Sequence, residues 1–269
     1  MTRIGCLFQQ RQKALIAYLT AGDPSPARTP ALIHALVRGG ADLIELGVPF
    51  SDPIADGPVI QRAGERALKA GTTLHTVLDI AREVRKTSQV PLLLFTYLNP
   101  VLRYGLDRLG KDAAAAGIDG CLLTDAGVEE AESYVDAMHA HGLDTVFLAA
   151  PTSTKRRLEL VAKYSTGFVY LVSRTGVTGE RDSLSSAVTP LIQSVRAVTN
   201  LPLAVGFGIS KPEHVAELSP QVEGIVVGSA IVRIIEANAA DLELQLETYA
   251  RSLKDALRVS APPRQKGTL

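Results

Sequence analysis

The chain has 269 residues, of which 46% are hydrophobic and 21% are charged, and its formal net charge is zero. This length is enough for a substantial core, and the neutral charge gives no electrostatic reason to expect a nucleic acid or a membrane surface as a partner. No apolar run is long enough to span a bilayer, the first residues lack a secretory hydrophobic segment, and two cysteines (Cys6 and Cys121) form no disulfide framework, so we expect a reducing cytoplasm.

Eight short apolar runs rich in Val, Ile and Leu recur along the chain, separated by stretches with helical spacing. Glycine stands between several of these stretches and the next run, as in "RGGADLIELG", which is typical of a helix end followed by a new strand. Such alternation indicates a parallel sheet covered on both faces, and eight units in about 250 residues favour a closed (β/α)8 TIM barrel over an open doubly wound sheet. The expected strands are 14–19, 42–46, 92–97, 120–124, 145–149, 168–172, 203–207 and 224–228.

We expect a single barrel domain over residues 1–269, with a disordered tail from about residue 259 that ends in "APPRQKGTL". The sequence shows no strong internal repeat, no low-complexity segment and no interdomain linker. In such a barrel, function gathers beyond the carboxyl ends of the strands, because the loops there converge on one face. This rule selects residues that are scattered in sequence: Glu45, Asp56, Thr96, Asn99, Asp125, Tyr170, Ser173, Gly206, Gly208, Gly228 and Ser229.

Two carboxylates stand out among these candidates. Glu45 interrupts an apolar strand, where a glutamate is almost never fully buried unless it is paired or functional. An ion pair with a cation on a surrounding helix is the structural alternative, but perturbed carboxylates cluster at active sites. Asp56 precedes Gly57, which is ordinary turn chemistry, yet its proline-rich loop from Gly47 to Pro58 is long for a strand-to-helix connection. We therefore favour a functional role for both acids.

Tyr170 alternates with Phe168 and Val172, a pattern typical of a residue in the barrel core. Only its position near the end of a strand makes it a candidate for the site. The following segment, "SRTGVTGERDSLS" (residues 173–185), has the glycines and hydroxyls of a mobile lid, although an ordinary solvent-exposed loop has a similar composition.

Glycines at the ends of the last two expected strands point to a phosphate site. "AVGFGISKPE" carries Gly206 and Gly208 and then Ser210, which we expect to cap a helix with Glu213 three residues on. "GIVVGSAIVRIIE" places Gly228 and Ser229 directly before a short helix. Glycine lets backbone N–H groups approach an anion, and barrels commonly hold a substrate phosphate between these two loops and a short extra helix.

Several other chemistries lack their residues. No Lys lies within an expected strand, which disfavours a Schiff-base aldolase, and the five histidines have no metal-ligand spacing. The chain has neither GxGxxG nor GxxxxGK[ST] for a nucleotide. We expect acid-base chemistry by carboxylates on a phosphorylated substrate, with no metal and no cofactor.

Five motifs in this order, "LIELGVPFSDPIADGP", "FTYLNP", "GFVYLVSRTGVTG", "VGFGIS" and "GSAIV", resemble the alpha subunit of tryptophan synthase. The N-terminal "LIAYLTAGDP" fits as well, so the resemblance covers nearly the whole chain. It implies a lyase that cleaves indole-3-glycerol phosphate to indole and glyceraldehyde 3-phosphate by a retro-aldol reaction. Carried over residue by residue, it makes Glu45, Asp56 and Tyr170 catalytic, and it makes Thr178, Gly179, Phe207, Gly208, Gly228 and Ser229 the residues of the closing loop and the phosphate site.

These implied roles are physically reasonable. Indole C3 must be protonated before the C–C bond breaks, because indole cannot leave as a carbanion. Asp56 would stabilise the positive charge that develops on the ring and accept the ring N–H proton, while Glu45 would deliver a proton to C3 and take one from the side-chain hydroxyl. A glutamate that acts as both acid and base needs a raised pKa, which burial at an apolar strand end supplies.

The resemblance also implies a partner, the beta subunit, in an α2β2 assembly, and Ser51, Asp52 and Pro53 match the partner-facing segment. Pyridoxal phosphate belongs to that partner. Gly127 stands where we expect a proline, which loosens a segment on the same side. Three alternatives remain open: a free-standing lyase of the same family, a catalytically weak allosteric or scaffolding subunit, and a sugar-phosphate isomerase, which gives no reason for the long loop before Pro58.

Overall fold

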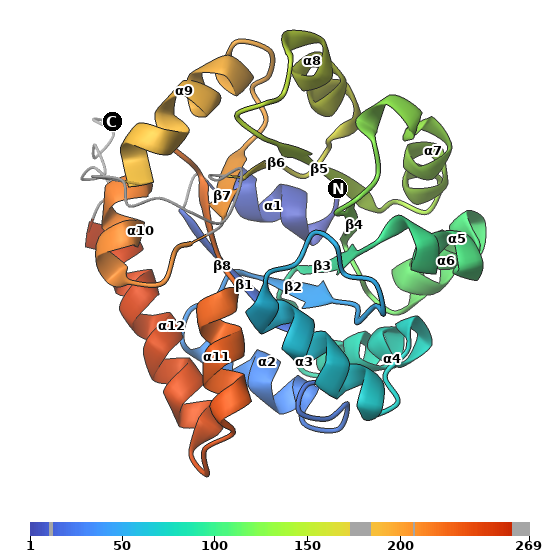
Figure 1. Ribbon diagram of the computed structural model, residues 1–269, viewed down its shortest axis with the longest axis vertical. Helices are drawn as coiled ribbons and strands as arrows, with labels where there is room; N and C mark the ends of the chain where they lie inside the picture. Colours follow the sequence, from blue (N-terminus) through green and yellow to red (C-terminus); the bar gives the residue numbers. More distant parts are fainter. Residues whose placement is uncertain (11–12, 173–183, 207, 260–269) are drawn as a thin grey trace, which may run out of the picture.

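The computed structural model describes residues 1–10, 13–172, 184–206 and 208–259, and the strands in this part of the chain form a closed parallel barrel (Figure 1). Each strand pairs with the next along the chain, and β8 closes the barrel by pairing with β1. The predicted (β/α)8 barrel is therefore confirmed, with strand ends within one residue of those expected. The strands are β1 Ala14–Thr20, β2 Leu43–Gly47, β3 Leu92–Thr96, β4 Gly120–Leu123, β5 Asp144–Ala149, β6 Val169–Val172, β7 Leu203–Gly206 and β8 Gly224–Val227.

The helices surround the barrel in Figure 1, and two of them rather than one follow β2, β3 and β8. Gly40, Gly117 and Gly142 have positive φ angles of 104°, 80° and 73° just before β2, β4 and β5, as expected for helix ends that turn back into the sheet. The helices are α1 Arg3–Gln9, α2 Thr29–Arg38, α3 Pro58–Lys69, α4 Leu74–Arg85, α5 Leu98–Tyr104, α6 Leu106–Ala115, the 3-10 turn η1 Val128–Glu130, α7 Glu132–Ala140, α8 Lys155–Tyr164, α9 Leu184–Arg196, α10 Pro212–Leu218, α11 Ser229–Ala237 and α12 Leu242–Val259.

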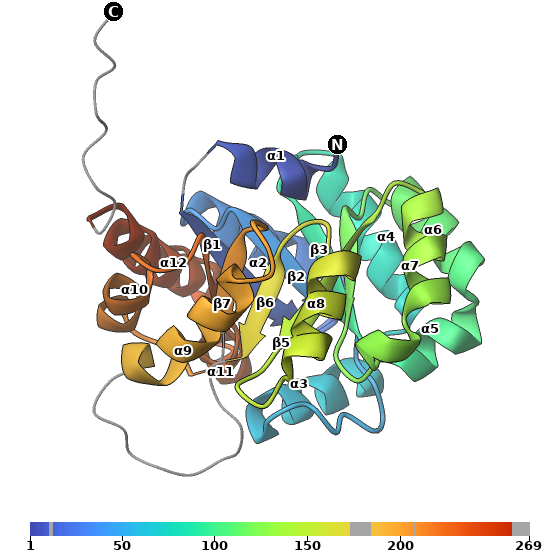
Figure 2. The same cartoon turned by 90° about the horizontal axis from the view of Figure 1, so that it is seen from above.

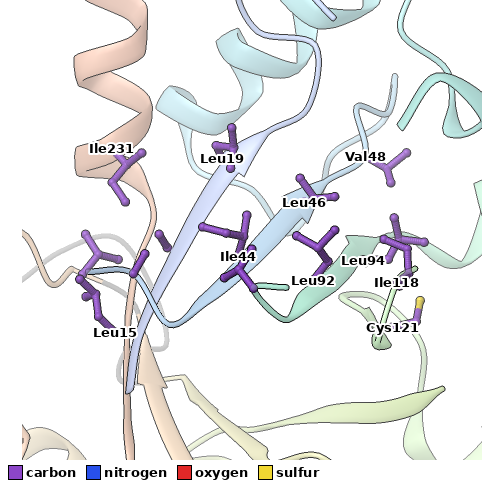
Figure 3. Packing of buried hydrophobic residues seen from close by; sticks show 14 of the residues in the cluster. Leu15, Leu19, Ile44, Leu46, Val48, Leu92, Leu94, Ile118, Cys121 and Ile231 are labelled. Atoms are coloured by element: carbon purple, nitrogen blue, oxygen red, sulfur yellow. The ribbon is translucent and has the colours of Figure 1, made fainter. Parts of the chain in front are cut away.

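The strands are apolar on both faces because each face is covered. Outward side chains of β1, β2 and β3 pack in the layer between barrel and helices, where Ile231 of α11 also lies (Figure 3). Inward side chains such as Leu43, Leu93 and Val146 fill the barrel itself. A glutamate at an inward position of β2 is therefore placed in an apolar interior by the register of the strand alone.

Helix α1 closes the amino end of the barrel, as Figure 2 shows from the side. Its buried Ile4 and Phe8 join the inward-facing cluster, and the rings of Phe8 and Phe168 have centroids 5.6 Å apart. Full burial of such side chains stabilises the packing of α1 against the barrel by about 1.5–3 kcal/mol each, so α1 stays in place and covers the amino end. A ligand must then enter from the carboxyl ends of the strands. The sequence analysis did not anticipate this helix.

One predicted helix start is wrong. We expected Ser210 to cap a helix, but α10 begins at Pro212, and Lys211 is its N-cap without a side-chain hydrogen bond. The reason is the proline, which fits the first helical position and holds the residue before it in extended backbone, here with φ −134° and ψ 152°.

Two further predictions fall mainly on residues outside the described part of the chain. These are the lid, of which residues 173–183 are not described, and the tail beyond residue 259. The assignment of residues 1–269 to one domain stays a prediction. Within the described residues, none of the helices has the length and apolar character needed to cross a membrane.

Candidate active site

The carboxyl ends of the strands surround a cavity of about 260 Å³. Six of the nine predicted site residues line it, although they come from β2, β6 and the loops after β2, β7 and β8. These are Glu45, Asp56, Tyr170, Gly208, Gly228 and Ser229. The other three, Thr178, Gly179 and Phe207, lie outside the described residues. The barrel thus brings the two acids and the glycine-rich loops to one cavity.

Glu45 points into the barrel from β2, level with Tyr18 of β1 and Leu93 of β3. Its side chain is fully buried, and neither carboxylate oxygen has a hydrogen-bond partner among the described residues. The alternative interpretation, a structural ion pair with a helix cation, is therefore wrong. Burial without a partner disfavours the charged form and raises the pKa of Glu45 to about 8.

Asp56 lies near the end of the loop that joins β2 to α3, where its backbone carbonyl accepts a 2.9 Å hydrogen bond from the Gln61 side chain. Its own side chain is half-buried at the edge of the cavity. Burial raises the pKa of Asp56 to about 6, and a hydrogen bond from the Tyr97 hydroxyl opposes that rise. The two acids therefore have well-separated pKa values although they face one cavity.

The difference between the two pKa values determines which of the two acids carries a proton at neutral pH. With a pKa of about 8, Glu45 is mainly protonated at pH 7 and can donate a proton. With a pKa of about 6, Asp56 is mainly ionised at the same pH and can stabilise or accept positive charge. The cavity lining thus includes one carboxyl group that can donate a proton and one carboxylate that can accept one.

Two tyrosine rings cross the barrel interior because glycines make room for them. A methyl group on Gly206 would lie 2.3 Å from the Tyr170 hydroxyl oxygen, and one on Gly47 would lie 2.2 Å from that of Tyr18. Burial raises the pKa of both phenols well above the usual value, so both remain neutral hydrogen-bonding groups. Tyr170 belongs to the apolar core cluster and also lines the cavity, so both of its predicted placements hold.

The part of the cavity wall formed after β7 and β8 is suited to an anion. Gly208 has a positive φ of 82°, and Gly228 immediately precedes Ser229, the first residue of α11. The free N–H groups and the dipole of a helix N-terminus favour negative charge, and no acidic residue stands in the first turn of α11. Arg233, one turn further along α11, adds a cation to the lining. This wall fits a phosphate group.

Four described residues chosen by the strand-end rule do not line the cavity: Thr96, Asn99, Asp125 and Gly206, while Ser173 lies outside the described residues. Thr96 alternates with the inward Phe95 and is fully buried outside the lining, while Asn99 is exposed in the first turn of α5. Asp125 accepts a 2.7 Å hydrogen bond from the Leu98 backbone N–H, so it satisfies the start of α5. Because α5 begins two residues after β3 ends, this strand contributes mainly through Phe95.

The lining residues that the sequence analysis missed include Tyr18, Phe95 and Arg233. Tyr18 and Phe95 occupy the inward positions just before their strand ends, and their rings meet edge to face with centroids 5.2 Å apart. Strand alternation would have found both. Arg233 lies four residues after Ser229, and helical spacing puts both on one face of α11.

A family model described as tryptophan synthase alpha chain matches residues 6–258. The chain belongs to the tryptophan synthase alpha chain family. The alpha chain of Solibacter usitatus is 80% identical over 260 residues, which are 94% of this chain and 97% of that relative. The alpha chain of Geobacter sulfurreducens is 47% identical over 262 residues, covering 96% of this chain and 99% of that relative.

Solved structures of tryptophan synthase alpha chains share the barrel. Subunit alpha from Legionella pneumophila superposes with a TM-score of 0.87 at 38% identity, over 96% of this chain and 99% of that one. A chain from the tryptophan synthase α2β2 complex of Pyrococcus furiosus gives a TM-score of 0.85 at 41% identity, over 91% of this chain and 99% of that one. Family membership therefore rests on nearly the whole chain.

Proposed function

We propose that this alpha chain is a carbon-carbon lyase that cleaves indole-3-glycerol phosphate to indole and glyceraldehyde 3-phosphate. The observation that carries this proposal is the shared cavity. It holds a buried acid with a pKa of about 8 and an ionised acid with a pKa of about 6, and Gly208, Gly228 and Ser229 line the same cavity. A substrate with an aromatic ring at one end and a phosphate at the other matches that arrangement.

In the proposed reaction, protonated Glu45 donates its proton to C3 of the indole ring, which gives an indolenine-like cation. The carboxylate of Asp56 stabilises the positive charge on the ring by accepting the ring N–H proton, and it returns this proton to the nitrogen as the C–C bond breaks and neutral indole forms. Glu45, now ionised, takes the proton from the side-chain hydroxyl as the C–C bond breaks and the aldehyde forms. Each well-placed proton transfer of this kind contributes about 10²–10⁴-fold to the rate.

The remaining residues bind and enclose the substrate in this proposal. The backbone of Gly208 and the N-terminus of α11 at Gly228 and Ser229 hold the phosphate, and Tyr170 lies near the reacting carbon. Phe207, Thr178 and Gly179, which the resemblance assigns to the phosphate site and the closing loop, lie outside the described residues. Support for the phosphate assignment comes from the positive φ of Gly208 and the acid-free first turn of α11.

Replacing Ser229 by Asp tests the phosphate assignment. A carboxylate at the first residue of α11 repels the substrate phosphate, so we expect KM for indole-3-glycerol phosphate to rise about 100-fold or more, with a smaller effect on kcat. The same carboxylate interacts favourably with the helix dipole, so the melting temperature should stay the same or rise. Steady-state kinetics and thermal unfolding measure the two effects.

Ser229→Ala is the matched control for this experiment. It removes the hydroxyl but keeps the backbone N–H groups of α11, so its KM should stay within about tenfold of the wild-type value. A Ser229→Asp variant with wild-type KM would place the phosphate elsewhere.

We also propose that the chain works with a tryptophan synthase beta subunit in an α2β2 assembly, in the cytoplasm, where its two unpaired cysteines stay reduced. Ser51 and Asp52 are exposed on the loop before α3, and the adjacent Ile54 is 83% exposed. An apolar side chain this exposed on the catalytic loop is suited to a partner surface. The backbone at Gly127 has φ −65°, which a proline would also adopt, so the glycine does not require a different loop shape.

The decisive experiment is an assay of the purified chain with indole-3-glycerol phosphate, alone and with a beta subunit. Because the chain contains no tryptophan, indole released by the chain alone can be followed by fluorescence without a tryptophan background. We expect indole release by the chain alone and a higher rate with the partner present. No turnover under either condition would contradict the lyase proposal. Turnover that is indifferent to the beta subunit would favour the free-standing enzyme instead.

A further inference from the structure

The two helices that border the cavity differ in how closely they follow their strands. β2 ends at Gly47 and α3 begins at Pro58, so residues 48–57 separate this strand from its helix. Only Gly228 separates β8 from α11, which begins at Ser229. The barrel therefore determines where α11 starts, whereas α3 must be held in place by contacts of its own.

The position of Asp56 depends on α3. Asp56 lies two residues before this helix, and its backbone carbonyl accepts the 2.9 Å hydrogen bond from the Gln61 side chain of α3. α3 and α11 lie side by side (Figure 1), and the cavity lining includes both Asp56 and Ser229, at the start of α11. A displacement of α3 along α11 would therefore change the distance between the assigned base and the assigned phosphate site.

Apolar packing brings the two helices together. Ala63 of α3 and Val232 of α11 are fully buried and belong to one cluster with Tyr18 of β1. The hydrophobic effect is not directional, so this cluster favours the contact without fixing how far α3 lies along α11.

Arg66 of α3 supplies the directional contacts. Its guanidinium donates two 2.8 Å hydrogen bonds to the carboxylate of Asp23, which lies shortly after β1 and is 1% exposed. It donates a third, of 2.9 Å, to Glu236 of α11. Glu236 also accepts hydrogen bonds of 2.7 and 2.9 Å from Arg62 of α3. Because paired arginine–carboxylate hydrogen bonds impose a geometry, this junction fixes α3 against both the barrel and α11.

We propose that Arg66 is a positioning residue for the lyase reaction, whose guanidinium fixes α3 on Asp23 and Glu236 and thereby holds Asp56 at the distance from the phosphate site that the substrate spans. This inference rests on the proposed function, because it acts through the base assigned there. Arg66 is not part of the cavity lining. The proposal also gives a role to Asp23 of the N-terminal motif "LIAYLTAGDP", which the proposed function leaves without one.

Arg66→Lys tests the proposal, because it keeps a positive charge beside the buried Asp23 carboxylate but removes the planar fork that reaches both acids. We expect kcat for indole release to fall about tenfold, since a misplacement of about 1 Å can cost up to about 10²-fold. The inhibition constant of glyceraldehyde 3-phosphate, the phosphorylated product, should change about twofold or less, because the start of α11 keeps its place.

Combining Arg66→Lys with Asp56→Asn shows whether the effect runs through Asp56. If it does, Arg66→Lys should change the residual rate of Asp56→Asn by about twofold or less, since the position of a carboxylate that is already lost no longer matters. Losses that multiply would show that Arg66 acts on the fold as a whole, and they would overturn the proposal.

Arg196→Lys is the matched control. The Arg196 side chain is 33% exposed against 31% for Arg66, and it donates hydrogen bonds of 2.5 and 2.7 Å to the Glu223 carboxylate and one of 3.0 Å to the Leu201 carbonyl. Glu223 directly precedes β8, at the amino end of the barrel and away from the cavity. We expect Arg196→Lys to keep the wild-type kcat, and thermal unfolding shows whether each variant is folded.

Glu236→Gln is a second variant, which keeps the buried pair of Arg66 and Asp23 and should fold even if Arg66→Lys does not. Its kcat should also fall, and this fall should disappear in the Asp56→Asn background. A wild-type kcat in folded Arg66→Lys or in Glu236→Gln overturns the positioning role. Failure of the proposed function gives a different result, since the wild-type chain itself would then release no indole.

Discussion

Replacing Glu45 by Gln is expected to lower the rate of indole release by about 10²–10⁴-fold, the contribution of a general acid that also acts as base. Glutamine fills the same volume as the protonated glutamic acid that the cavity holds at pH 7, but it cannot transfer a proton. KM should change little, because the side chain lies at the reacting end and the phosphate is bound elsewhere. Steady-state release of indole by the purified alpha chain measures the loss.

The control for this variant is Glu65→Gln on α3, an exposed glutamate outside the cavity, which should keep wild-type turnover. If Glu45→Gln retained even a tenth of the wild-type rate, Glu45 would not be the proton donor. That result would revive the interpretation of the chain as a subunit with little catalysis of its own.

Although Glu45→Gln lowers the rate, it is expected to raise the stability of the fold at high pH, and the direction of this change follows from the raised pKa of Glu45. Glu45 titrates at 4.5 in the unfolded chain and at about 8 in the fold, so the folded state binds the proton more tightly. Between these pH values wild-type stability falls by about 1.4 kcal/mol per pH unit, and this loss is complete above pH 8. The Glu45→Gln variant does not lose this stability, because glutamine has no proton to release at these pH values. Its melting temperature should match the wild-type value near pH 4.5 and exceed it at pH 8.

The fold was predictable because each strand carries its own signal. Runs of Val, Ile and Leu bounded by glycine identify buried parallel strands, and their number implies closure into a barrel. The two errors concern short helices. The seven-residue α1 has no strong periodicity, and its stability comes from packing Ile4 and Phe8 under the barrel. The start of α10 depends on Pro212, which outweighed the capping potential of Ser210.

The residues of the site were predictable where the position of a residue along its strand determines whether its side chain points into the barrel. Glu45 and Tyr170 occupy inward positions at strand ends, so alternation and the barrel rule place them in one cavity. The contact between Tyr97 and the loop before α3 was not predictable in this way. The Ala55 N–H donates a hydrogen bond to the Tyr97 hydroxyl 42 residues later, and no local pattern encodes the approach of that loop to the end of β3. The raised pKa of Glu45 was expected from its apolar neighbours, and the smaller rise for Asp56 agrees with its lesser burial.

Asp56→Asn is expected to reduce indole release by about 10²–10³-fold, since it removes the negative charge that stabilises the cationic ring. Asparagine keeps the size of the side chain, and the hydrogen bond from the Ala55 N–H to the Tyr97 hydroxyl does not involve it, so the loop should keep its place. The loss should therefore appear in kcat rather than in KM for the phosphorylated substrate. The difference from the wild type should be largest above pH 6, where the Asp56 carboxyl group is ionised, and should shrink below that pH as the wild type loses the same charge.

Asp52→Asn in the same loop separates this electrostatic effect from a general disturbance of the loop. Asp52 is exposed and lies outside the cavity lining, and its carboxylate accepts a 2.6 Å hydrogen bond from the neighbouring Ser51. With the alpha chain assayed alone, this variant should match the wild type. Equal losses in the two variants would mean that the loop as a whole, and not the Asp56 carboxylate, is what catalysis requires. A loss confined to Asp56→Asn would leave the charge itself as the cause.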